Sequence, residues 1–358
     1  MYNSFLYRIL RREGNEIRMK KLAIIVLNWN GTKDTIECLE SLEKNEIYDI
    51  FVLDNGSSEK EKNKLLDYVK NGKYTNDCVI GNNIESVIEK KGVLKIITYK
   101  LNLGFAGGNN YIAEKISEYY EYILLLNNDT EVPKESIENM LQCIKENSYT
   151  AITCDIRYFY DKNLLWNAGG KFTFYGERKY YSQKKIDKLK HRGIKHIQVD
   201  FITGCAMLVS SAYLKKYGLF TNRFFHGEED FNFCLKAKKR NVRIGVDLDA
   251  IIYHKVGRTL KHNADDRQRV FNSKVLHYSN RAIDYKEFYC KSKWLLWKEM
   301  YLFLVFVKRI ISDRNVKETH CLMKEIRKNV KINDKITKSV FDEIMRYEFS
   351  EEKNKVKK

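Results

Sequence analysis

Close pairs of cysteine are missing from this sequence, and so are long apolar runs. The eight cysteines stand singly, without the paired spacing of a zinc knuckle or a redox motif, so we expect reduced thiols. Residues 1–19 carry charge on both sides of a short apolar stretch and lack the long apolar core of a secretory signal. We therefore expect a cytoplasmic active site and a short N-terminal extension over residues 1–19.

Internal repeats and low-complexity linkers are also absent, which favours one large domain followed by an appendage. With 44% hydrophobic and 13% aromatic residues, the 358-residue chain can build a sizeable core and is not a disordered chain. The one boundary that we expect lies near residues 258–270. The main domain then covers residues 20–258, and a basic helical region covers residues 259–358.

Positive charge is in excess and is unevenly distributed. The chain has 65 Lys and Arg against 47 Asp and Glu, which gives a formal charge of +18. From Lys255 to the end there are 26 Lys and Arg against 14 Asp and Glu, so most of the excess lies in the C-terminal third. Such a surface indicates phosphates, anionic lipid or nucleic acid as partners.

Four short apolar runs rich in branched residues have the length of strands, and helix-like segments such as residues 35–44 and 134–146 lie between them. This alternation predicts an α/β fold with a parallel sheet, whose ligands bind beyond the carboxyl ends of the strands. Polar clusters follow three of the runs at that point. The runs are residues 22–27, 50–53, 93–99 and 122–126, and the clusters are residues 28–31, 54–58 and 127–129.

Further along, residues 201–209 are expected to form a buried strand, residues 210–216 a helix, and residues 251–254 a last short strand. The C-terminal region then contains an apolar aromatic stretch, Trp294 to Val307, interrupted by Lys298 and Glu299. It is too short and broken to span a bilayer. Two interpretations stay open for it: a helix lying in the membrane interface, or a helix packed on the main domain.

Several side chains at the strand ends are candidates for ligand binding. Asp54 can accept hydrogen bonds from a ligand with Asn28 and Asn30 nearby, although Asp-Asn-Gly-Ser is also strong turn chemistry. The glycine-rich segment from Gly104 to Asn110 allows close approach of a ligand to the backbone, ahead of a helix expected near Tyr111.

Acidic residues supply the candidates for chemistry. Asp129 ends an apolar strand, where it either binds a hard divalent cation or caps the next helix. Glu228, Glu229 and Asp230 are consecutive carboxylates at a helix start, where one of them is a candidate general base and a solvated first turn is the alternative. His254 is either a metal ligand or a core histidine.

Taken together, these segments closely resemble glycosyltransferase family 2, and within it the rhamnosyltransferase-like branch. The resemblance rests on motifs in a fixed order over roughly residues 20–258. The motifs are Ile25-Val26-Leu27-Asn28-Trp29-Asn30-Gly31, Val52-Leu53-Asp54-Asn55-Gly56-Ser57-Ser58, Asn102-Leu103-Gly104-Phe105-Ala106-Gly107-Gly108-Asn109, Leu125-Leu126-Asn127-Asn128-Asp129, Thr203-Gly204-Cys205-Ala206-Met207, Gly218-Leu219-Phe220, Glu229-Asp230 and Tyr253-His254-Lys255.

The resemblance implies a GT-A fold, a mixed Rossmann-like nucleotide-binding sheet flanked by helices, and an inverting transfer that uses Mg²⁺ or Mn²⁺. It makes Asp230, beside Glu229, the catalytic base, and it makes Asp129 and His254 metal ligands. Asp54 would hold the nucleobase or ribose. The full set expected to bind the nucleotide sugar is Asn28, Asn30, Asp54, Asn55, Gly104, Gly107, Asn109 and Asn128.

Two positions depart from the family pattern. Asn127 stands in place of the first Asp of the Asp-x-Asp motif, and Asn232 stands where many relatives have a second Asp after the base. A protein that binds a nucleotide sugar without turnover is therefore one alternative. A nucleic-acid-binding protein is the other, but the aromatic residues mixed into the basic tail favour a membrane surface.

The expected activity is transfer of one hexose to a glycan or polyprenyl-diphosphate-linked glycan in cell-surface polysaccharide assembly. A processive synthase is disfavoured because the sequence has no Gln-x-x-Arg-Trp segment and no pair of membrane-spanning helices. The family likeness suggests dTDP-rhamnose as donor, with a UDP-hexose next. We expect a peripheral location at the cytoplasmic face of the membrane and no nucleic-acid partner.

Overall fold

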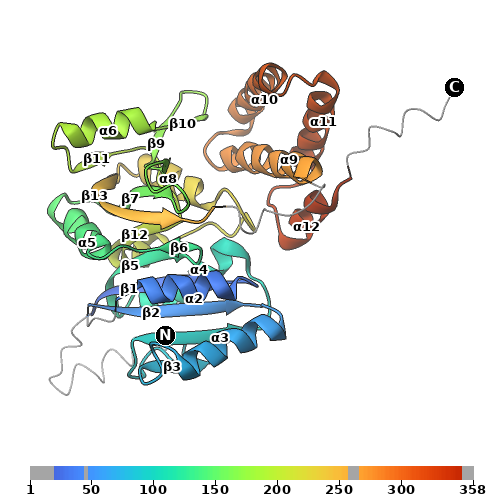
Figure 1. The fold of residues 1–358 in the computed structure, drawn as a ribbon. Helices are drawn as coiled ribbons and strands as arrows, with labels where there is room; N and C mark the ends of the chain where they lie inside the picture. The colour runs from blue at the N-terminus through green and yellow to red at the C-terminus, as the bar shows by residue number, and fades with distance from the viewer. Residues whose placement is uncertain (1–19, 44–46, 257–265, 349–358) are drawn as a thin grey trace.

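The computed structural model describes residues 20–43, 47–256 and 266–348, and Figure 1 shows its two parts, a sheet flanked by helices and a C-terminal group of helices. The predicted extension over residues 1–19 lies outside the described residues, as does most of the predicted boundary near residue 258. The large sheet has the strand order β11-β13-β7-β12-β5-β1-β2-β4-β3, with β6 beside β13 and β8 beside β7.

The strands of the large sheet form where apolar side chains dominate. Its strands are β1 (Lys20–Asn28), β2 (Tyr48–Asn55), β3 (Cys78–Gly81), β4 (Leu94–Tyr99), β5 (Tyr120–Asn127), β6 (Thr130–Glu131), β7 (Ala151–Tyr158), β8 (Leu165–Asn167), β11 (His196–Gln198), β12 (Ala206–Ser210) and β13 (Ile244–His254). A separate hairpin consists of β9 (Gly170–Phe172) and β10 (Arg178–Tyr180).

Strands β5, β1, β2, β4 and β3 run parallel, whereas β12 is antiparallel to both of its neighbours. The sheet is therefore mixed. The four early apolar runs are confirmed as strands. The predicted strand over residues 201–209 is wrong in its first half, because only Ala206–Ser210 pairs along β5.

Alternate residues of each strand point to opposite faces, and both faces are covered. In β1, Leu22, Ile24 and Val26 pack beneath α2, α3 and α5, while Ala23 and Ile25 pack on the other face with α4, α7 and α8. The covering helices are α2 (Thr32–Ser41), α3 (Glu59–Asn71), α4 (Gly104–Ile116), α5 (Ser136–Glu146), α7 (Ser211–Tyr217) and α8 (Glu229–Lys239), and α6 (Gln183–His191) lies after the hairpin.

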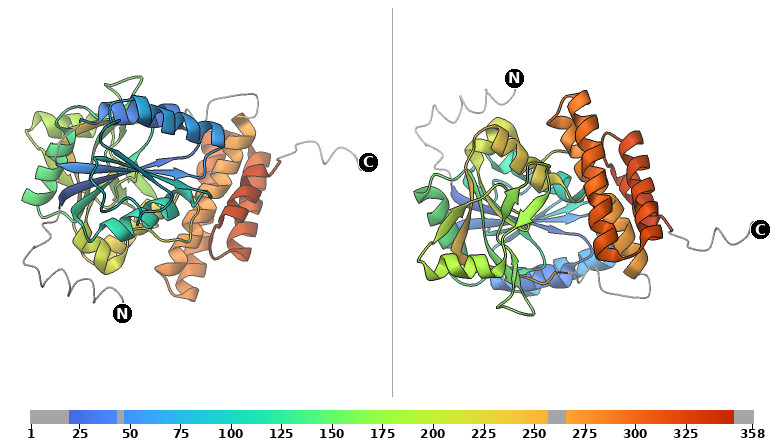
Figure 2. Two further views of the ribbon diagram at one scale, coloured as in Figure 1. Left: turned by 90° about the horizontal axis from the view of Figure 1, so that it is seen from below. Right: turned by 90° about the horizontal axis from the view of Figure 1, so that it is seen from above.

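The C-terminal helices form a layer with its own hydrophobic core on one side of the sheet (Figure 2). Trp297 lies at its centre, stacked between Tyr285 at 4.2 Å and Tyr301 at 4.9 Å between ring centroids. The indole N–H of Trp297 donates to the carbonyl of Tyr175 in the β9–β10 hairpin. The layer consists of α9 (Asp266–Asp284), a 3₁₀ turn η2 (Tyr285–Glu287), α10 (Lys291–Asp313), α11 (Val316–Ile332) and α12 (Lys338–Arg346).

One face of the aromatic stretch in α10 packs in the core of the C-terminal helices and is linked to the β9–β10 hairpin by Trp297 and Lys308, so both interpretations of the stretch stay predictions. The other face stays exposed, with Leu296 at 77% and Phe303 at 63%.

A buried charge cluster holds the amino ends of the parallel strands. Asp49 at the start of β2 accepts hydrogen bonds from the ammonium groups of Lys95 (3.1 Å) and Lys20 (2.8 Å) and from the hydroxyl of Tyr120. Burial lowers the pKa of Lys95, and Asp49 opposes that shift. The cluster lies at the sheet edge opposite to the predicted site.

Replacing Asp49 with Ala should leave the ammonium of Lys95 buried without its counter-charge. We expect the free energy of unfolding to fall by about 3–5 kcal/mol, measured by urea denaturation. Lys20→Ala is the matched control, because the Lys20 side chain is 57% exposed and its loss should cost less than about 1 kcal/mol. Equal losses in the two variants would contradict this account.

Candidate functional site

Several residues that the sequence predicts as ligand-binding lie together where β1, β2 and β5 end. The parallel register sets Asn28 beside Asp54 and Leu27 beside Asn127. The amide of Asn28 donates to Asp54 Oδ1 at 3.1 Å, and its Oδ1 accepts from the hydroxyl of Thr35 at 2.9 Å. Strand register therefore brings together side chains that lie 26 residues apart in sequence.

Asp54 keeps one buried oxygen free. Its side chain is fully buried, and Oδ2 has no hydrogen-bond partner among the described residues. Burial raises the pKa of Asp54, while hydrogen bonds from Ser57 and Asn28 oppose the shift. A buried acceptor without a partner can take a hydrogen bond from a ligand, such as a ring N–H of a pyrimidine base.

Asn30 and Asn128 complete the rim of this edge. Asn30 adopts φ 53°, and its side-chain oxygen accepts from the N–H of Ser58 at 2.8 Å. The amide of Asn128 donates to the hydroxyl of Thr35 at 3.0 Å. A Cβ at Gly31 would lie 2.9 Å from that amide nitrogen, so the Asn128 side chain lies close against the turn.

The glycine-rich segment is helical from its first glycine, so the helix predicted near Tyr111 begins earlier, at Gly104. Gly104 has φ +76°, and a Cβ there would lie 2.3 Å from the carbonyl oxygen of Phe225, so no other residue fits without displacement. Gly107 lies in the first turns of the same helix.

Two of the predicted binding residues have their side chains engaged by the protein. The amide of Asn55 donates to Asn102 and Gly104, and its oxygen accepts from the N–H of Leu103. The amide of Asn109 donates to the carbonyl of Phe105 in its own helix. Asn55 holds the segment at the start of α4, whereas Asn109 bonds within α4, and a direct contact with the nucleotide stays a prediction for each.

Asp129 and His254 lie side by side although 125 positions separate them. Strand β6 pairs with the end of β13, and the N–H of Lys255 donates to the carbonyl of Asp129. His254 Nε2 then lies 3.0 Å from Asp129 Oδ1, and Trp166 packs edge-on against the imidazole. Among the residues that the structure describes, no group of three His, Cys, Asp or Glu side chains gathers around a possible metal position.

Lys255, next to His254, was not among the predicted site residues. Its side chain is buried and forms ion pairs with Asp34 at 3.3 Å and Glu37 at 2.5 Å, both on α2. These bonds tie the end of β13 to the helix that follows the first polar cluster. The motif Tyr253-His254-Lys255 was the available signal, but it gave no hint of the partners on α2.

The three acidic residues before α8 have different surroundings. Glu228 is buried and pairs with Arg178 of β10, whose guanidinium stacks on the ring of Phe231. Glu229 is buried and accepts hydrogen bonds from the N–H groups of Gly227 and Glu228. Arg178 was missed from the sequence because only the folded hairpin brings it next to Glu228.

Asp230 is the half-buried member of the three. Its Oδ2 accepts from the N–H of Gly204 at 3.2 Å, and its Oδ1 accepts from the N–H of Phe231 at 2.8 Å. Burial, with a further contribution from Glu229, raises the pKa of Asp230 to about 7. A carboxyl group with that pKa can both accept and release a proton near neutral pH.

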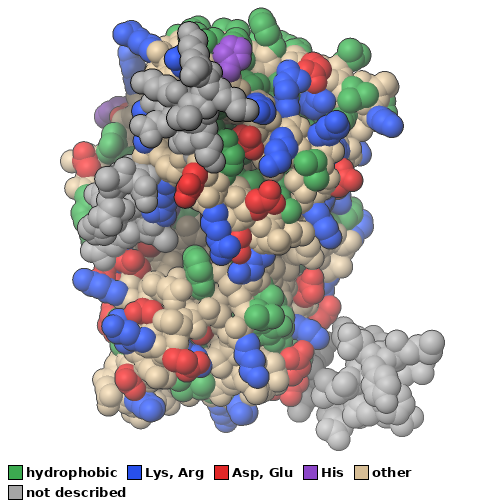
Figure 3. All heavy atoms as spheres, turned by 90° about the vertical axis from the view of Figure 1, so that its right-hand side faces the viewer, with side chains coloured by type: hydrophobic (Ala, Val, Ile, Leu, Met, Phe, Trp, Pro, Cys, Tyr) green, Lys and Arg blue, Asp and Glu red, His purple; other side chains and the backbone are tan. Residues whose placement is uncertain are grey.

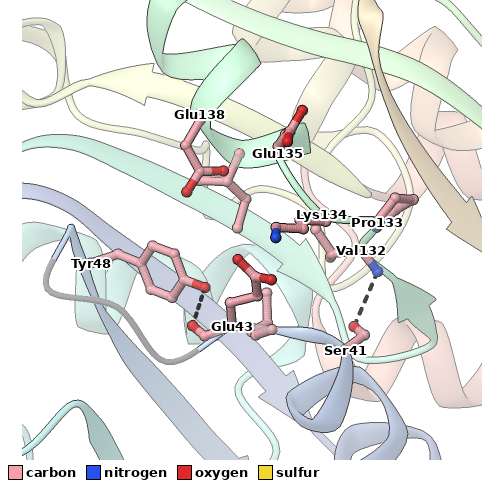
Figure 4. Close-up of a pocket in the computed structure, with 10 residues that line it drawn as sticks. Ser41, Glu43, Tyr48, Val132, Pro133, Lys134, Glu135 and Glu138 are labelled. Atoms are coloured by element: carbon pink, nitrogen blue, oxygen red, sulfur yellow. Dashed lines mark hydrogen bonds between the residues drawn. The ribbon is translucent and has the colours of Figure 1, made fainter.

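A small hollow elsewhere does not compete with this site. Figure 4 shows Glu43, Tyr48 and Glu138 around a cavity of about 10 Å³ between the end of α2 and the start of α5. That volume holds about one water molecule. The hollow contains none of the residues predicted for the site.

The raised pKa of Asp230 predicts a pH-dependent gain in stability for Asp230→Asn. In the wild type, ionising this group costs stability progressively as the pH rises from about 4 to about 7, and the full cost applies above 7. The Tm of the variant should therefore exceed that of the wild type at pH 8, and the difference should shrink towards pH 4. Asp67→Asn on the exposed face of α3 is the control, and a lower Tm for Asp230→Asn at pH 8 would refute the assignment.

Comparisons with known proteins bear on the family and the fold of the chain. The sequence model described as glycosyl transferase family 2 matches residues 23–218, more than half of the chain. A hexosyltransferase of low-salt glycan biosynthesis from Haloferax volcanii, Agl10, is 26% identical over 150 residues. That alignment covers 40% of this chain and 46% of the relative, so the chain spans about half the length of the curated relative it matches.

Among solved structures, GalNAc-T7 with UDP, GalNAc and Mn²⁺ superimposes with a TM-score of 0.53 at 13% identity, over 80% of this chain and 55% of that one. A mannosyltransferase from Pyrobaculum calidifontis in complex with GDP-Man and Mn²⁺ gives a TM-score of 0.48 at 11% identity, over 92% and 94% of the two chains. The mixed sheet and its flanking helices form a GT-A fold, as predicted.

Proposed function

The chain belongs to glycosyl transferase family 2, and on that premise we propose that it moves one hexose from a nucleotide-sugar donor to an acceptor hydroxyl with inversion. The observation that carries the proposal is the combination of Asp54 with a free buried oxygen, the Asp129–His254 pair, and Asp230 with a pKa of about 7. These are the three kinds of group that such a transfer requires.

The donor binds across the ends of β1, β2 and β5. Asp54 accepts a hydrogen bond from the base or ribose, and Asn28 holds the Asp54 carboxylate in place. The start of α4 lies beside these strand ends, and Gly104 has no side chain because the carbonyl of Phe225 lies against it. Asn30 and Asn128 line the same edge.

Asp129 and His254 fit a divalent cation in one specific way. Together they offer one carboxylate and one imidazole nitrogen, and the side chain of Asp129 is 19% exposed, so solvent and ligand reach it. Mg²⁺ is commonly held by one or two carboxylates together with substrate phosphates. Bound here, Mg²⁺ or Mn²⁺ would neutralise the charge of the donor diphosphate.

Asp230 acts as the base in a single displacement. Its carboxylate takes the proton of the acceptor hydroxyl as that oxygen forms a bond to the anomeric carbon. The bond from the anomeric carbon to the diphosphate oxygen breaks at the same time, and the nucleoside diphosphate leaves with the electron pair. One displacement inverts the configuration at this carbon.

The donor sugar and the acceptor are proposed from the family likeness. We infer dTDP-rhamnose or a UDP-hexose as donor, and a glycan or polyprenyl-diphosphate-linked glycan of the cell surface as acceptor. The match to a hexosyltransferase of glycan biosynthesis supports this class of reaction.

A screen of dTDP-rhamnose, UDP-hexoses and GDP-mannose, with and without Mn²⁺, tests the function through release of the nucleoside diphosphate. For the productive donor, kcat should rise with pH up to about 7 and then level off, because Asp230 must be ionised to act as base. Asp230→Asn should lower kcat by about 10²–10⁴-fold with the fold intact. The charged or titratable neighbours of Asp230 include Arg178, Tyr180, Cys205, His226, Glu228, Glu229 and Cys234.

Asp67→Asn is again the control for this screen and should keep wild-type turnover. Turnover near the wild-type value in a folded Asp230→Asn protein would remove Asp230 from the role. Absence of turnover with every donor in the wild type would count against the transferase itself.

We further propose that the protein lies at the cytoplasmic membrane surface through the exposed face of α10. No helix in the described part of the chain is long and apolar enough to cross a bilayer. Figure 3 shows hydrophobic side chains exposed among Lys and Arg on the side of the molecule that carries the C-terminal helices. The exposed apolar residues of α10 are Leu295, Leu296, Met300, Phe303, Val307 and Ile311.

A basic groove adjoins this apolar face. It encloses about 350 Å³ between α10 and α11, with Trp294 and Leu295 on one side and Val330 on the other. Trp294 lies between two ammonium groups, at 4.9 Å from Lys286 and 5.0 Å from Lys298. Arg327 and Lys331 also line the groove, where Lys286 pairs with Asp334 and both Lys298 and Arg327 pair with Glu299. The groove keeps a positive excess, which suits the phosphate groups of anionic lipids.

Leu296→Glu combined with Phe303→Glu should abolish binding to vesicles that contain phosphatidylglycerol, because the apolar face can no longer enter the interface. Co-sedimentation with these vesicles, compared with vesicles of phosphatidylcholine alone, measures the effect. Ile80→Glu on edge strand β3 is the matched control, since Ile80 is also exposed, at 44%, but lies far along the sheet. Unchanged binding of the double variant would exclude this face as the membrane contact.

A further inference from the structure

The segment that leads into α8 is held by the C-terminal layer through its main chain. The N–H of Phe225 donates to the carbonyl of Ile336 at 2.8 Å, and the N–H of Ile336 donates to the carbonyl of Arg223 at 2.7 Å. The ring of Phe224 is buried within the core of the C-terminal helices. Residues 223–225 therefore pair with a chain segment more than 100 positions away.

The other side of this segment contacts the glycine-rich segment at the start of α4. The carbonyl of Phe225 accepts a hydrogen bond from the N–H of Phe105 at the start of α4. The same carbonyl is the atom that excludes a side chain at Gly104. Residues 223–225 thus lie between the start of α4 and the C-terminal layer. They precede Asp230 by only a few positions in the chain.

Asn232 connects α8 itself to that layer. Its side chain is fully buried one turn after the start of α8. Its amide donates to Asp284 Oδ1 at 2.6 Å and to Glu287 Oε2 at 3.0 Å. An amide is the group that suits this position, because it supplies two N–H donors to two carboxyl groups.

The second oxygens of this pair are also buried. Within the part of the chain that the structure describes, Asn232 Oδ1 and Asp284 Oδ2 have no hydrogen-bond partner. Burial, with a further contribution from Glu228, raises the pKa of Asp284 well above its usual range.

We propose that Asn232 is a positioning residue for the reaction, whose amide fixes the base-bearing end of α8 to Asp284 and Glu287, so that the C-terminal layer forms part of the active site. This inference rests on the proposed function, in which Asp230 is the base. It also accounts for the departure from the family pattern at position 232. An Asp there would face two other carboxyl groups in a buried position, whereas Asn bonds to both.

Asn232→Asp is the decisive variant. The new carboxylate meets Asp284 and Glu287, and repulsion should displace the start of α8 from the C-terminal layer. With the donor found productive in the screen, kcat should fall about tenfold or more, because small displacements of catalytic groups are costly. Binding of UDP or dTDP with Mn²⁺, measured by calorimetry, should change less than about twofold, since the donor contacts lie at other strand ends.

The double variant Asn232→Asp with Asp284→Asn exchanges the two side-chain groups between these positions. An amide then again lies opposite a carboxyl group. We expect this double variant to recover at least half of the decrease in log kcat that Asn232→Asp causes. Asn163→Asp, the same change in an exposed turn, is the matched control. Should Asn232→Asp fail to fold, Asn232→Ala removes both hydrogen bonds without adding charge and is measured in the same way.

Two further measurements separate positioning from a purely structural role. Where α8 is released, Asp230 becomes more hydrated, so the acidic limb of the kcat profile should move to lower pH. Amide hydrogen exchange over residues 224–231 should accelerate in Asn232→Asp and return towards wild type in the double variant.

Wild-type kcat in a folded Asn232→Asp protein, or a loss that Asp284→Asn fails to recover, would overturn the inference. If the wild type shows no transferase activity, the proposed function fails. Hydrogen exchange still decides whether Asn232 secures residues 224–231: unchanged exchange in Asn232→Asp would refute the connection itself.

Discussion

The parallel register of β5, β1 and β2 is the constraint on which the rest of the site depends. Because these strands run in one direction, their carboxyl ends reach the same edge, where Asn28 lies beside Asp54 and the segment after Asn127 follows directly. The amino ends are held at the opposite edge by Asp49 and its buried ion pair with Lys95. A change in register would alter the site, because each strand contributes only one or two of its side chains.

Asp129 and Asp230 are held in position by different kinds of contact. Asp129 continues from a parallel strand and meets His254 only because β6 pairs with the end of β13. Asp230 comes from a helix start that is fixed by Gly204 on the sheet side and by Asn232 on the side of the C-terminal layer. The position of Asp129 therefore depends on sheet pairing, whereas the position of Asp230, the proposed base, depends on packing between the sheet and the C-terminal helices.

The C-terminal layer has two faces with different chemistry. Its inner face supplies Ile336, Asp284 and Glu287 to the segment around α8, and those contacts are buried. Its outer face leaves the apolar residues of α10 exposed beside a groove lined by cations. An acceptor carried by a membrane would approach from the side on which these helices lie. The same helices would then connect membrane contact with the position of the base.

The sequence alone determined the early strands, the mixed use of helices and strands, and the polar clusters at strand ends, because these features follow from local patterns of apolar side chains and turns. It misplaced several boundaries: residues 201–205 do not continue the strand, the strand expected over residues 251–254 begins at Ile244, and α4 begins at Gly104, where the carbonyl of Phe225, 121 positions away, packs against the glycine. The neighbours of the carboxylates were decided only by tertiary structure. Arg178 beside Glu228, His254 beside Asp129 and Asp284 beside Asn232 are contacts between distant segments, and no local pattern encodes them. These neighbours set the burial and charge around each group, so the sequence could name the acidic residues, whereas the fold decided which of them has a pKa suited to a base.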